Sequence, residues 1–434
     1  MHKYRILLLI LFWAFGSFVF AQNELKLEKV TVVSRHSVRT PLESNIATLN
    51  EITGEGNKWI QWTANYGELT PKGDSLERLF GAYFRLYLND KQFAVESLSD
   101  EDVYFGASSK QRTVKTACAF ASRMLPHVKV SVDYKKDSNK DYGYLDPDYL
   151  PLLNDFSLSK GEFNLNAFKA EAYRELGKLQ TPPYAFLEEV IGMETSKYAK
   201  ERGIKHFRDC VEVCLNFYKD KGERAEPTMV GGLRDANTAS DAFILQYYEM
   251  EDEKAAAFGH DLSFEDWKKL AAIKDYYGYI LFEKAPIISV NVSHCMLMRL
   301  QAEMLPNGHK FAFFCTHDSM IAALLAALRV KPYSLDSTIE VKTPIGGKLV
   351  FEQWTDQDKL NPEKYIQVFY VYQSSEQIRG IQMLDLSNPP MKYELSFDGI
   401  EKAPNGKYKY EDFMQHLQNS IQAYDATARG ENPW

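Results

Sequence analysis

The stretch from Val30 to Pro41 reads VTVVSRHSVRTP, and the rest of the chain is organised around it. Its β-branched first half predicts a buried strand, which gives way at Ser34 to a short charged segment closed by a proline. Ligands of open α/β sheets bind beyond the carboxyl ends of the strands. Two arginines in one turn at such an end favour a doubly charged oxyanion such as phosphate, because guanidinium groups are planar, permanently charged and bidentate.

The histidine in this segment is a candidate nucleophile. His36 lies between Arg35 and Arg39. Two neighbouring cations depress the pKa of a histidine, so its imidazole is neutral and nucleophilic. An isolated R-H-x-x-R segment can equally be a basic turn on a surface loop, so the remaining sequence has to decide.

The same placement recurs at two further strand ends. Residues 102–106 predict a strand that leads into a helix, with Arg112 at the junction. Residues 310–316 predict an apolar strand, followed by His317, Asp318 and the apolar helix 320–328. A lone arginine at a helix start is usually a solvated charge. The repetition at strand ends instead predicts that all these side chains meet at one edge of the sheet.

The middle of the chain has a different pattern of predicted secondary structure. Between residues 147 and 286 strand-like alternation disappears, and helical patterns follow at 165–179, 184–191, 198–218, 236–251 and 264–282. Such a block predicts an inserted helical cap domain, of the kind that often covers an active site and selects the substrate. The α/β catalytic domain is then formed by 22–146 and 287–434. Within the block, Asp241 is either a charge on a helix surface or an acid of the substrate pocket.

The N-terminus predicts export. Residues 1–21 combine Lys3 and Arg5 with an apolar run and a small residue at Ala21, which is typical of a cleaved signal peptide; an uncleaved anchor is the alternative. We therefore expect a periplasmic or secreted protein that has no membrane association after cleavage. The whole chain carries a net charge of −8, and loss of the leader makes it more negative, which disfavours nucleic acid as a partner.

The five cysteines predict neither a metal site nor a cofactor, because they form no C-x-x-C motif and have no paired histidines. An odd number leaves at least one free thiol. Cys118 and Cys315 lie in apolar patterns and are predicted to be small core residues. Cys210 and Cys214, four residues apart in a predicted helix, would share a helix face.

The strand-end residues contain the groups needed to hydrolyse a phosphomonoester without a metal. The arginines and His317 can surround a phosphate dianion. His36 can attack phosphorus to form a phosphohistidine. Asp318 can protonate the leaving alkoxide, which requires it to be neutral when substrate is bound, so acidic pH should favour activity.

Residues 35–41 resemble the R-H-G-x-R-x-P signature of the histidine acid phosphatases, branch 2 of the histidine phosphatase superfamily, and His317–Asp318 resembles their H-D motif. The resemblance implies a phosphoglycerate-mutase-like three-layer α/β/α domain with an inserted, mostly α-helical cap domain. It also implies that the first histidine is phosphorylated, that the aspartate donates the proton and that the remaining site residues bind phosphate. These roles fall on His36, Asp318, and on Arg35, Arg39, Arg112 and His317.

The similarity extends along most of the mature chain and is greatest to bacterial periplasmic glucose-1-phosphatases, with phytases somewhat further away. It is carried by residues 57–62, 69–73, 241–249, 331–333, 343–351 and 371–374. Ser37 replaces the usual glycine of the signature, and Met320 stands where relatives often have asparagine. The C-terminal region also lacks the cysteines that form disulfides in enterobacterial relatives.

Glu43 bears on the choice of substrate. It stands where phytases tend to carry a basic residue, so the comparison favours singly phosphorylated sugars over phytate, although an exposed loop acid is an equally good interpretation. One alternative function is a phytase or inositol polyphosphate phosphatase. Another is a phosphate or sugar-phosphate binding protein without turnover. A phosphosugar mutase fits an exported protein poorly, and the sequence leaves the oligomeric state open.

Overall fold

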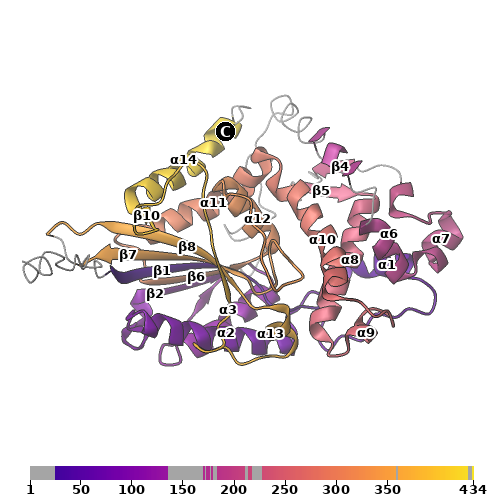
Figure 1. Ribbon diagram of the computed structural model, residues 1–434, viewed down its shortest axis with the longest axis horizontal. Coiled ribbons are helices and arrows are strands. Elements are labelled where there is room, and N and C mark those ends of the chain that lie inside the picture. Colours follow the sequence, from indigo (N-terminus) through magenta and orange to yellow (C-terminus); the bar gives the residue numbers. More distant parts are fainter. Residues whose placement is uncertain are drawn as a thin grey trace, which may run out of the picture.

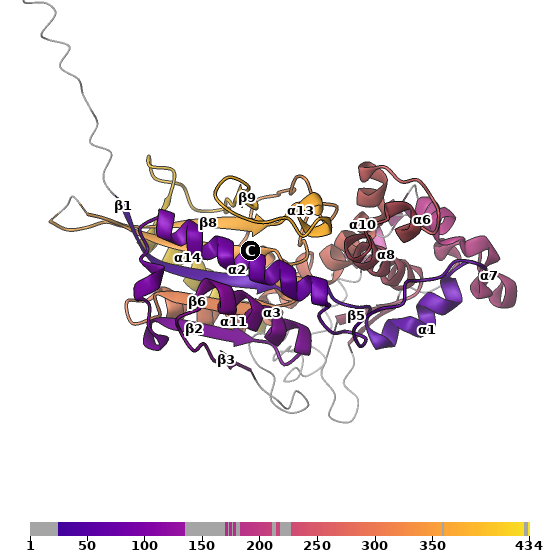
Figure 2. The same ribbon diagram turned by 90° about the horizontal axis from the view of Figure 1, so that it is seen from below.

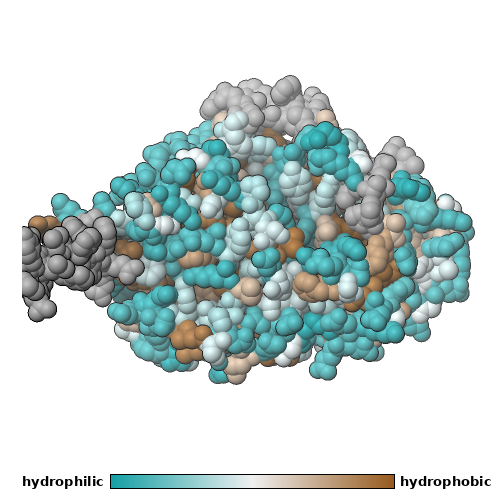
Figure 3. Space-filling model, viewed as in Figure 1, coloured by the Kyte–Doolittle hydropathy of each residue, from teal (hydrophilic) through white to brown (hydrophobic). Residues whose placement is uncertain are grey.

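The computed structural model describes residues 25–134, 170–171, 173–175, 177–178, 183–210, 214–217, 227–357, 360–428 and 433–434. The predicted signal peptide lies outside these residues, and the predicted helix at 165–179 lies mostly outside them. None of the helices in the described ranges is long and apolar enough to cross a membrane. Figure 3 shows a mainly hydrophilic face with scattered apolar side chains.

An eight-stranded sheet forms the centre of one half of the molecule (Figure 1). Its strand order is β10-β8-β7-β1-β6-β2-β3, and β9 pairs with β8. β1, β6, β2 and β3 run parallel, whereas β7 is antiparallel to β1 and β8 is antiparallel to β7. The strands are β1 (Leu25–Arg35), β2 (Val103–Ala107), β3 (Val132–Asp133), β6 (Phe311–Thr316), β7 (Lys348–Asp356), β8 (Lys364–Tyr372), β9 (Met391–Glu394) and β10 (Tyr408–Lys409).

Helices cover both faces of this sheet (Figures 1 and 2). α2 (Pro71–Asp90) and α3 (Gln111–Met124) pack together on one face. On the other face lie α11 (Pro286–Met304), α12 (Asp318–Ala327) and α14 (Tyr410–Ala428). The predicted three-layer α/β/α architecture is therefore confirmed.

A block of helices stands beside the sheet domain, at the right of Figure 1. α1, from the N-terminal segment, packs against α7 and α8 of this block. The predicted domain boundaries at 147 and 286 stay a prediction. The elements are α1 (Glu43–Ile52), α6 (Pro183–Ile191), α7 (Lys197–Arg202), α8 (Gly232–Glu249), α9 (Glu253–Ala256), α10 (Phe264–Gly278), a π-helical turn η5 (Tyr279–Glu283) and a hairpin of β4 (Cys214–Phe217) and β5 (Pro227–Val230).

Shorter helical elements of the described chain include η1 (Val95–Ser97), η2 (Asp100–Asp102), η3 (Met193–Thr195), η4 (Phe207–Asp209) and α13 (Ser375–Arg379).

The prediction of a single helix over residues 198–218 is wrong. α7 ends at Arg202 because Gly203 adopts a left-handed conformation with φ 69°, and its N–H donates to the carbonyl oxygen of Ala199. Cys214 begins strand β4, so it does not share a helix face with Cys210.

The prediction that Cys118 is a core residue is also wrong, because its side chain is exposed. Phe120 sets the buried face of α3 by stacking on Phe313 of β6 with ring centroids 4.4 Å apart. Cys118 lies two residues earlier, about 200° around the helix, and so faces away. Cys315 is buried as expected, and the described cysteines Cys118, Cys210, Cys295 and Cys315 are free thiols.

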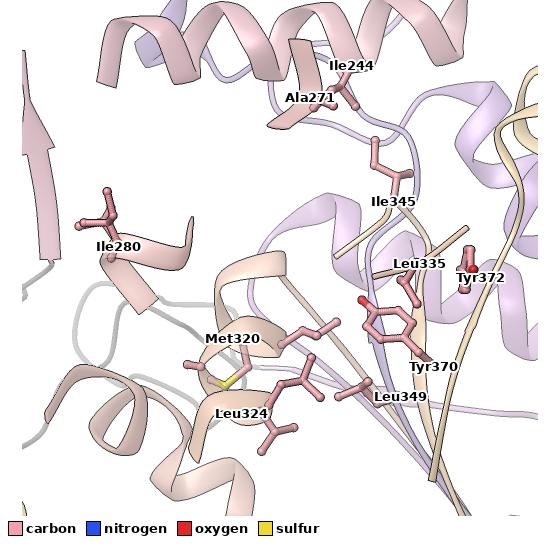
Figure 4. Close-up of a cluster of buried hydrophobic side chains, with 14 of the residues drawn as sticks. Ile244, Ala271, Ile280, Met320, Leu324, Leu335, Ile345, Leu349, Tyr370 and Tyr372 are labelled. Carbon is pink, nitrogen blue, oxygen red and sulfur yellow. The ribbon is translucent and has the colours of Figure 1, made fainter. Parts of the chain in front are cut away.

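One hydrophobic core runs from the sheet into the helical block. Figure 4 shows Leu349 and Tyr370 of the sheet near Met320 of α12, and Ile345 between the sheet and Ile244 of α8. Burial of this continuous apolar surface fixes the helical block against the sheet domain. Met320 is fully buried in this core, so its side chain serves to fill apolar space.

A buried ion pair joins the end of β1 to α2 and to the start of β7. Lys348 Nζ lies 3.0 Å from Glu77 Oε2 and donates to Ser34 Oγ at 3.1 Å and to the carbonyl oxygen of Gly346 at 2.9 Å. Both charged side chains are 0% exposed. The pair thus holds the strand end that carries His36.

Removing one partner of this ion pair should strongly destabilise the fold. Glu77→Ala leaves an uncompensated buried ammonium group and should lower the free energy of unfolding by about 3–5 kcal/mol, measured by urea denaturation. The double variant Glu77→Leu/Lys348→Met, which removes both charges, should lose much less. The exposed pair Arg85–Glu96 offers a control, because Glu96→Ala should cost under ~1 kcal/mol. Equal losses for the two glutamates would contradict the prediction.

Candidate active site

The carboxyl ends of β1, β6 and β2 lie side by side, as their register requires. Cys315 of β6 pairs with Ser34 of β1 on one side and with Ala107 of β2 on the other. The backbone N–H of His36 donates to the carbonyl oxygen of Thr316 at 3.0 Å, which extends the ladder by one residue. The side chains that follow the three strands are therefore delivered to one edge of the sheet.

His36 is buried at this edge, and its tautomer follows from its hydrogen bond. Nδ1 lies 2.8 Å from the carbonyl oxygen of Ser37, which can only accept, so Nδ1 carries the proton and Nε2 carries the lone pair. Burial and the positive charge of Arg112 hold the pKa of His36 well below its usual value, and Arg35 and Arg39 act in the same direction. The ring is neutral, as the sequence predicted.

His317 faces His36, with ring centroids 5.4 Å apart and an interplanar angle of 70°. Its Nε2 lies 3.0 Å from Ser108 Oγ, and its Nδ1 lies 3.4 Å from Arg112 Nη2. Because an arginine only donates, Nδ1 accepts and Nε2–H donates to the serine. Burial and Arg112 hold the pKa of His317 well below its usual value, so it is a neutral donor.

Arg35 is almost fully buried and is held by acidic partners. Its Nη1 lies 2.6 Å from Glu340 Oε1 and donates to the carbonyl oxygen of Thr343 at 2.5 Å, and its Nη2 lies 3.2 Å from Asp318 Oδ2. Burial opposes the charge, but Glu340 and Asp318 outweigh it and raise the pKa of Arg35. Its Nε is buried and makes no hydrogen bond within the described residues, so a donor remains available for a ligand.

Arg39 pairs with Asp241 of α8, with 2.9 Å between Nη2 and Oδ2. Asp241 is only 5% exposed, so it is not a charge on a helix surface. Burial disfavours its carboxylate, but Arg39 and Lys274 outweigh burial and lower the pKa of Asp241. Its proposed place in the substrate pocket stays a prediction, although the structure brings it to the site.

Asp318 is the first residue of α12, and its side chain is 28% exposed. Oδ1 accepts the backbone N–H of Ser319 at 3.0 Å, and Oδ2 lies 2.5 Å from Lys274 Nζ. Burial opposes ionisation, but Lys274 and Arg35 outweigh it and hold the pKa of Asp318 well below its usual value. In the free protein this carboxylate is therefore ionised.

Sequence reasoning missed two charged residues of the site. Lys274 comes from α10 of the helical block, where it reads as one charge of a polar helix face. Glu340 lies in the loop before β7, whose backbone is tied to the signature: the N–H of Gly346 donates to the carbonyl oxygen of His36 at 3.1 Å. The only sequence signal for this loop is the family resemblance at residues 343–351.

Ser37 and Glu43, which the sequence also singled out, lie in different surroundings: the first is buried and the second is exposed. Ser37 is buried, and its backbone N–H donates to Thr116 Oγ1 of α3 at 3.2 Å, so the replacement for glycine is accommodated next to the nucleophile. Glu43 is exposed in the first turn of α1 and makes no ion pair with the site among the described residues. Its role in substrate choice stays a prediction.

The described site combines a neutral nucleophile with cations that face Asp318, an acid that is only partly exposed. Its donors come from the ends of three parallel strands, and its counter-ions come from α8, α10 and the loop before β7. Guanidinium groups aimed at a phosphoryl group stabilise the charge that develops during its transfer. The arrangement is therefore suited to phosphoryl transfer to an imidazole.

The family model for the histidine phosphatase superfamily (branch 2) matches residues 26–371. A glucose-1-phosphatase of Providencia rettgeri is 34% identical, covering 92% of this chain and 93% of the relative. A glucose-1-phosphatase of Salmonella typhimurium is 31% identical, covering 88% and 89%. The apo form of Hafnia alvei phytase shares the fold with a TM-score of 0.79 at 22% identity, covering 93% of this chain and 98% of that chain. The chain therefore belongs to the histidine phosphatase superfamily (branch 2) and is a phosphatase.

Proposed function

We propose that this phosphatase hydrolyses sugar phosphates of the glucose 1-phosphate type, without a metal, through a phosphohistidine on His36. The observation that carries the proposal is the state of His36. Its Nε2 has a lone pair, its ring is neutral, and Arg35, Arg39, Arg112 and His317 gather around it. A neutral imidazole in a cluster of donors is the arrangement that attack on a phosphate dianion needs.

The reaction proceeds in two displacements. His36 Nε2 forms a bond to phosphorus as the bond to the sugar oxygen breaks, and Asp318 gives its proton to that oxygen. A water molecule then attacks the phosphohistidine while Asp318 takes a proton from it, which releases inorganic phosphate and restores His36. The arginines hold the phosphoryl oxygens through both steps, and His317, whose Nε2–H donates to Ser108 Oγ in the free protein, exchanges that partner for a phosphoryl oxygen when substrate binds.

The proposed substrate class rests on the relatives and on two acids. Two relatives above 30% identity are glucose-1-phosphatases, whereas an Escherichia coli relative named Phytase AppA is 26% identical. Asp241 engages Arg39, which leaves that arginine less free for an extra phosphate of phytate, and Glu43, four residues beyond Arg39 in the sequence, is an exposed acid that would repel one. Phytase is the second candidate, favoured by the fold shared with Hafnia alvei phytase.

A substrate comparison tests this choice. Glucose 1-phosphate should exceed phytate in kcat/KM by about tenfold or more, which corresponds to ~1.4 kcal/mol of electrostatic discrimination. Phosphate release is measured between pH 3 and 7 with EDTA present. Glu43→Lys should narrow the gap, and Glu51→Lys in the same helix is the matched control. A clear preference for phytate would contradict the assignment.

We also propose that the protein acts after export, in a periplasm or outside the cell. The support is the signal-peptide pattern of residues 1–21. The alternative of a binding protein without turnover predicts tight phosphate binding with no release from any phosphomonoester.

A further inference from the structure

Lys274 is, among the described site residues, the cation that the helical block contributes. It belongs to α10 of the helical block, and its Nζ lies 2.5 Å from Asp318 Oδ2, 3.6 Å from Asp241 Oδ1 and 3.6 Å from Glu340 Oε1. Its side chain is 13% exposed. One ammonium group thus stands among three carboxylates, and the carboxylate that it touches most closely is the acid proposed to protonate the leaving group.

Each acid of this network faces a cation in the unliganded protein, and Arg112 adds one further positive charge at the site. Arg35, Arg39 and Lys274 face Asp318, Asp241 and Glu340, so each of these cations has an acidic partner. A phosphate dianion that binds the arginines has to compete with Asp318 for Arg35 and with Asp241 for Arg39. Its arrival adds two negative charges, more than the one further positive charge of Arg112 neutralises, and such an addition favours uptake of a proton by a nearby carboxylate.

Asp318 is the carboxylate best placed to take that proton. Its side chain is 28% exposed, whereas those of Asp241 and Glu340 are 7% and 2% exposed. In the unliganded site, however, Lys274 and Arg35 favour its ionised form, although a proton donor must be neutral. The proposed reaction therefore needs a way to release Asp318 from its cations when substrate binds.

We infer that Lys274 is the positioning residue that provides this release: it keeps Asp318 ionised until substrate binds and then moves toward Asp241 and Glu340, so that Asp318 takes up a proton. The inference rests on the proposed function, because it assigns Asp318 as the proton donor. The carboxylates at 3.6 Å give the ammonium group a second place to bind. Binding of a dianion is then coupled to uptake of one proton from solvent, and the leaving oxygen later receives that proton.

The other groups around Asp318 do not provide this switch. His36 is neutral, and the pKa of Tyr370 on β8 is raised well above its usual value by burial, so it carries no charge. Burial raises the pKa of Asp275, the neighbour of Lys274, to about 8, so it is neutral in acid. Arg35 is fixed by Glu340 and by the carbonyl oxygen of Thr343. Lys274 alone among these cations comes from the opposite half of the molecule.

The pH profile of kcat/KM for glucose 1-phosphate tests the inference. In the variant Lys274→Met, Asp318 loses its nearest cation and therefore stays protonated to higher pH. The fall of kcat/KM on the alkaline side of the profile should then shift to higher pH by about 1 pH unit or more. Lys274→Arg keeps the charge and should restore the wild-type limb. Lys269→Met, at an exposed position of the same helix, is the matched control. A uniform loss of activity with an unmoved limb would show a merely structural role and overturn the inference.

Sulfate binding tests the coupling without catalysis, because sulfate is a dianion that does not titrate in this pH range. Calorimetry near pH 5 in two buffers of different ionisation enthalpy should show uptake of about one proton per sulfate in the wild type. Asp318→Asn should abolish the uptake, and Lys274→Met should reduce it. Sulfate binding without proton uptake, or no sulfate binding at all, overturns the inference even if glucose 1-phosphate is hydrolysed normally. Proton uptake in a protein that hydrolyses no phosphomonoester would instead overturn the proposed function alone.

Discussion

Replacing His36 with alanine should lower kcat for glucose 1-phosphate by about 10⁴-fold or more, the loss expected when a covalent nucleophile is removed. The residue is buried at the end of β1 with its Nε2 lone pair available, and no second imidazole can take its place. His317, the other ring of the site, donates through Nε2 to Ser108 and accepts from Arg112 through Nδ1. The measurement is steady-state phosphate release with EDTA present.

The same variant tests the intermediate. Rapid mixing with radiolabelled substrate, followed by an acid quench and mapping under conditions that preserve phosphohistidine, should place label on His36 in the wild type and none on the alanine variant. His260→Ala is a suitable control, because His260 lies in the loop between α9 and α10 and its backbone N–H donates to the carbonyl oxygen of Ala257. Activity that survives His36→Ala and requires a metal would contradict the mechanism.

The residues that sequence reasoning located share one physical property: they lie at or just beyond the carboxyl ends of parallel strands. Arg35 ends β1 and His36 follows it, His317 and Asp318 follow β6, and Arg112 lies in the first turn of α3 after β2. Parallel strands in register deliver their ends to one edge, so periodicity in the sequence is enough to bring these residues together. The alternation of apolar strands and helices along the chain likewise predicts an α/β fold, whereas the three-layer arrangement is implied by the family resemblance.

Residues outside this pattern could not be placed in the same way. Lys274 reaches the site only because the core between α8, α10 and the sheet fixes the helical block, which is a property of three-dimensional packing. Glu340 precedes a strand that is antiparallel to β1, so it arrives from the amino end of β7. The error at Cys118 has a related cause, because the buried face of α3 is set by the contact of Phe120 with β6.

The second large effect should come from Asp318, and it should depend on the leaving group. Asp318→Asn cannot donate a proton, so kcat for glucose 1-phosphate should fall by about 10²–10⁴-fold. For p-nitrophenyl phosphate the loss should be far smaller, because p-nitrophenolate is a weak base that leaves without protonation. The measurement is the ratio of the two losses at a fixed acidic pH, together with the pH profile of the variant, which should lose the limb set by Asp318.

This ratio separates two roles that the geometry gives to the same carboxylate. Asp318 Oδ2 also lies 3.2 Å from Arg35, so part of its effect comes from the position and charge of that arginine. A positional defect would weaken attack on phosphorus, which both substrates share, and would therefore slow them equally. Proton donation acts on the leaving oxygen alone and slows only the substrate whose alkoxide needs the proton. Equal losses would thus remove Asp318 from the role of general acid and leave it as a partner of Arg35, while unequal losses would identify it as the proton donor.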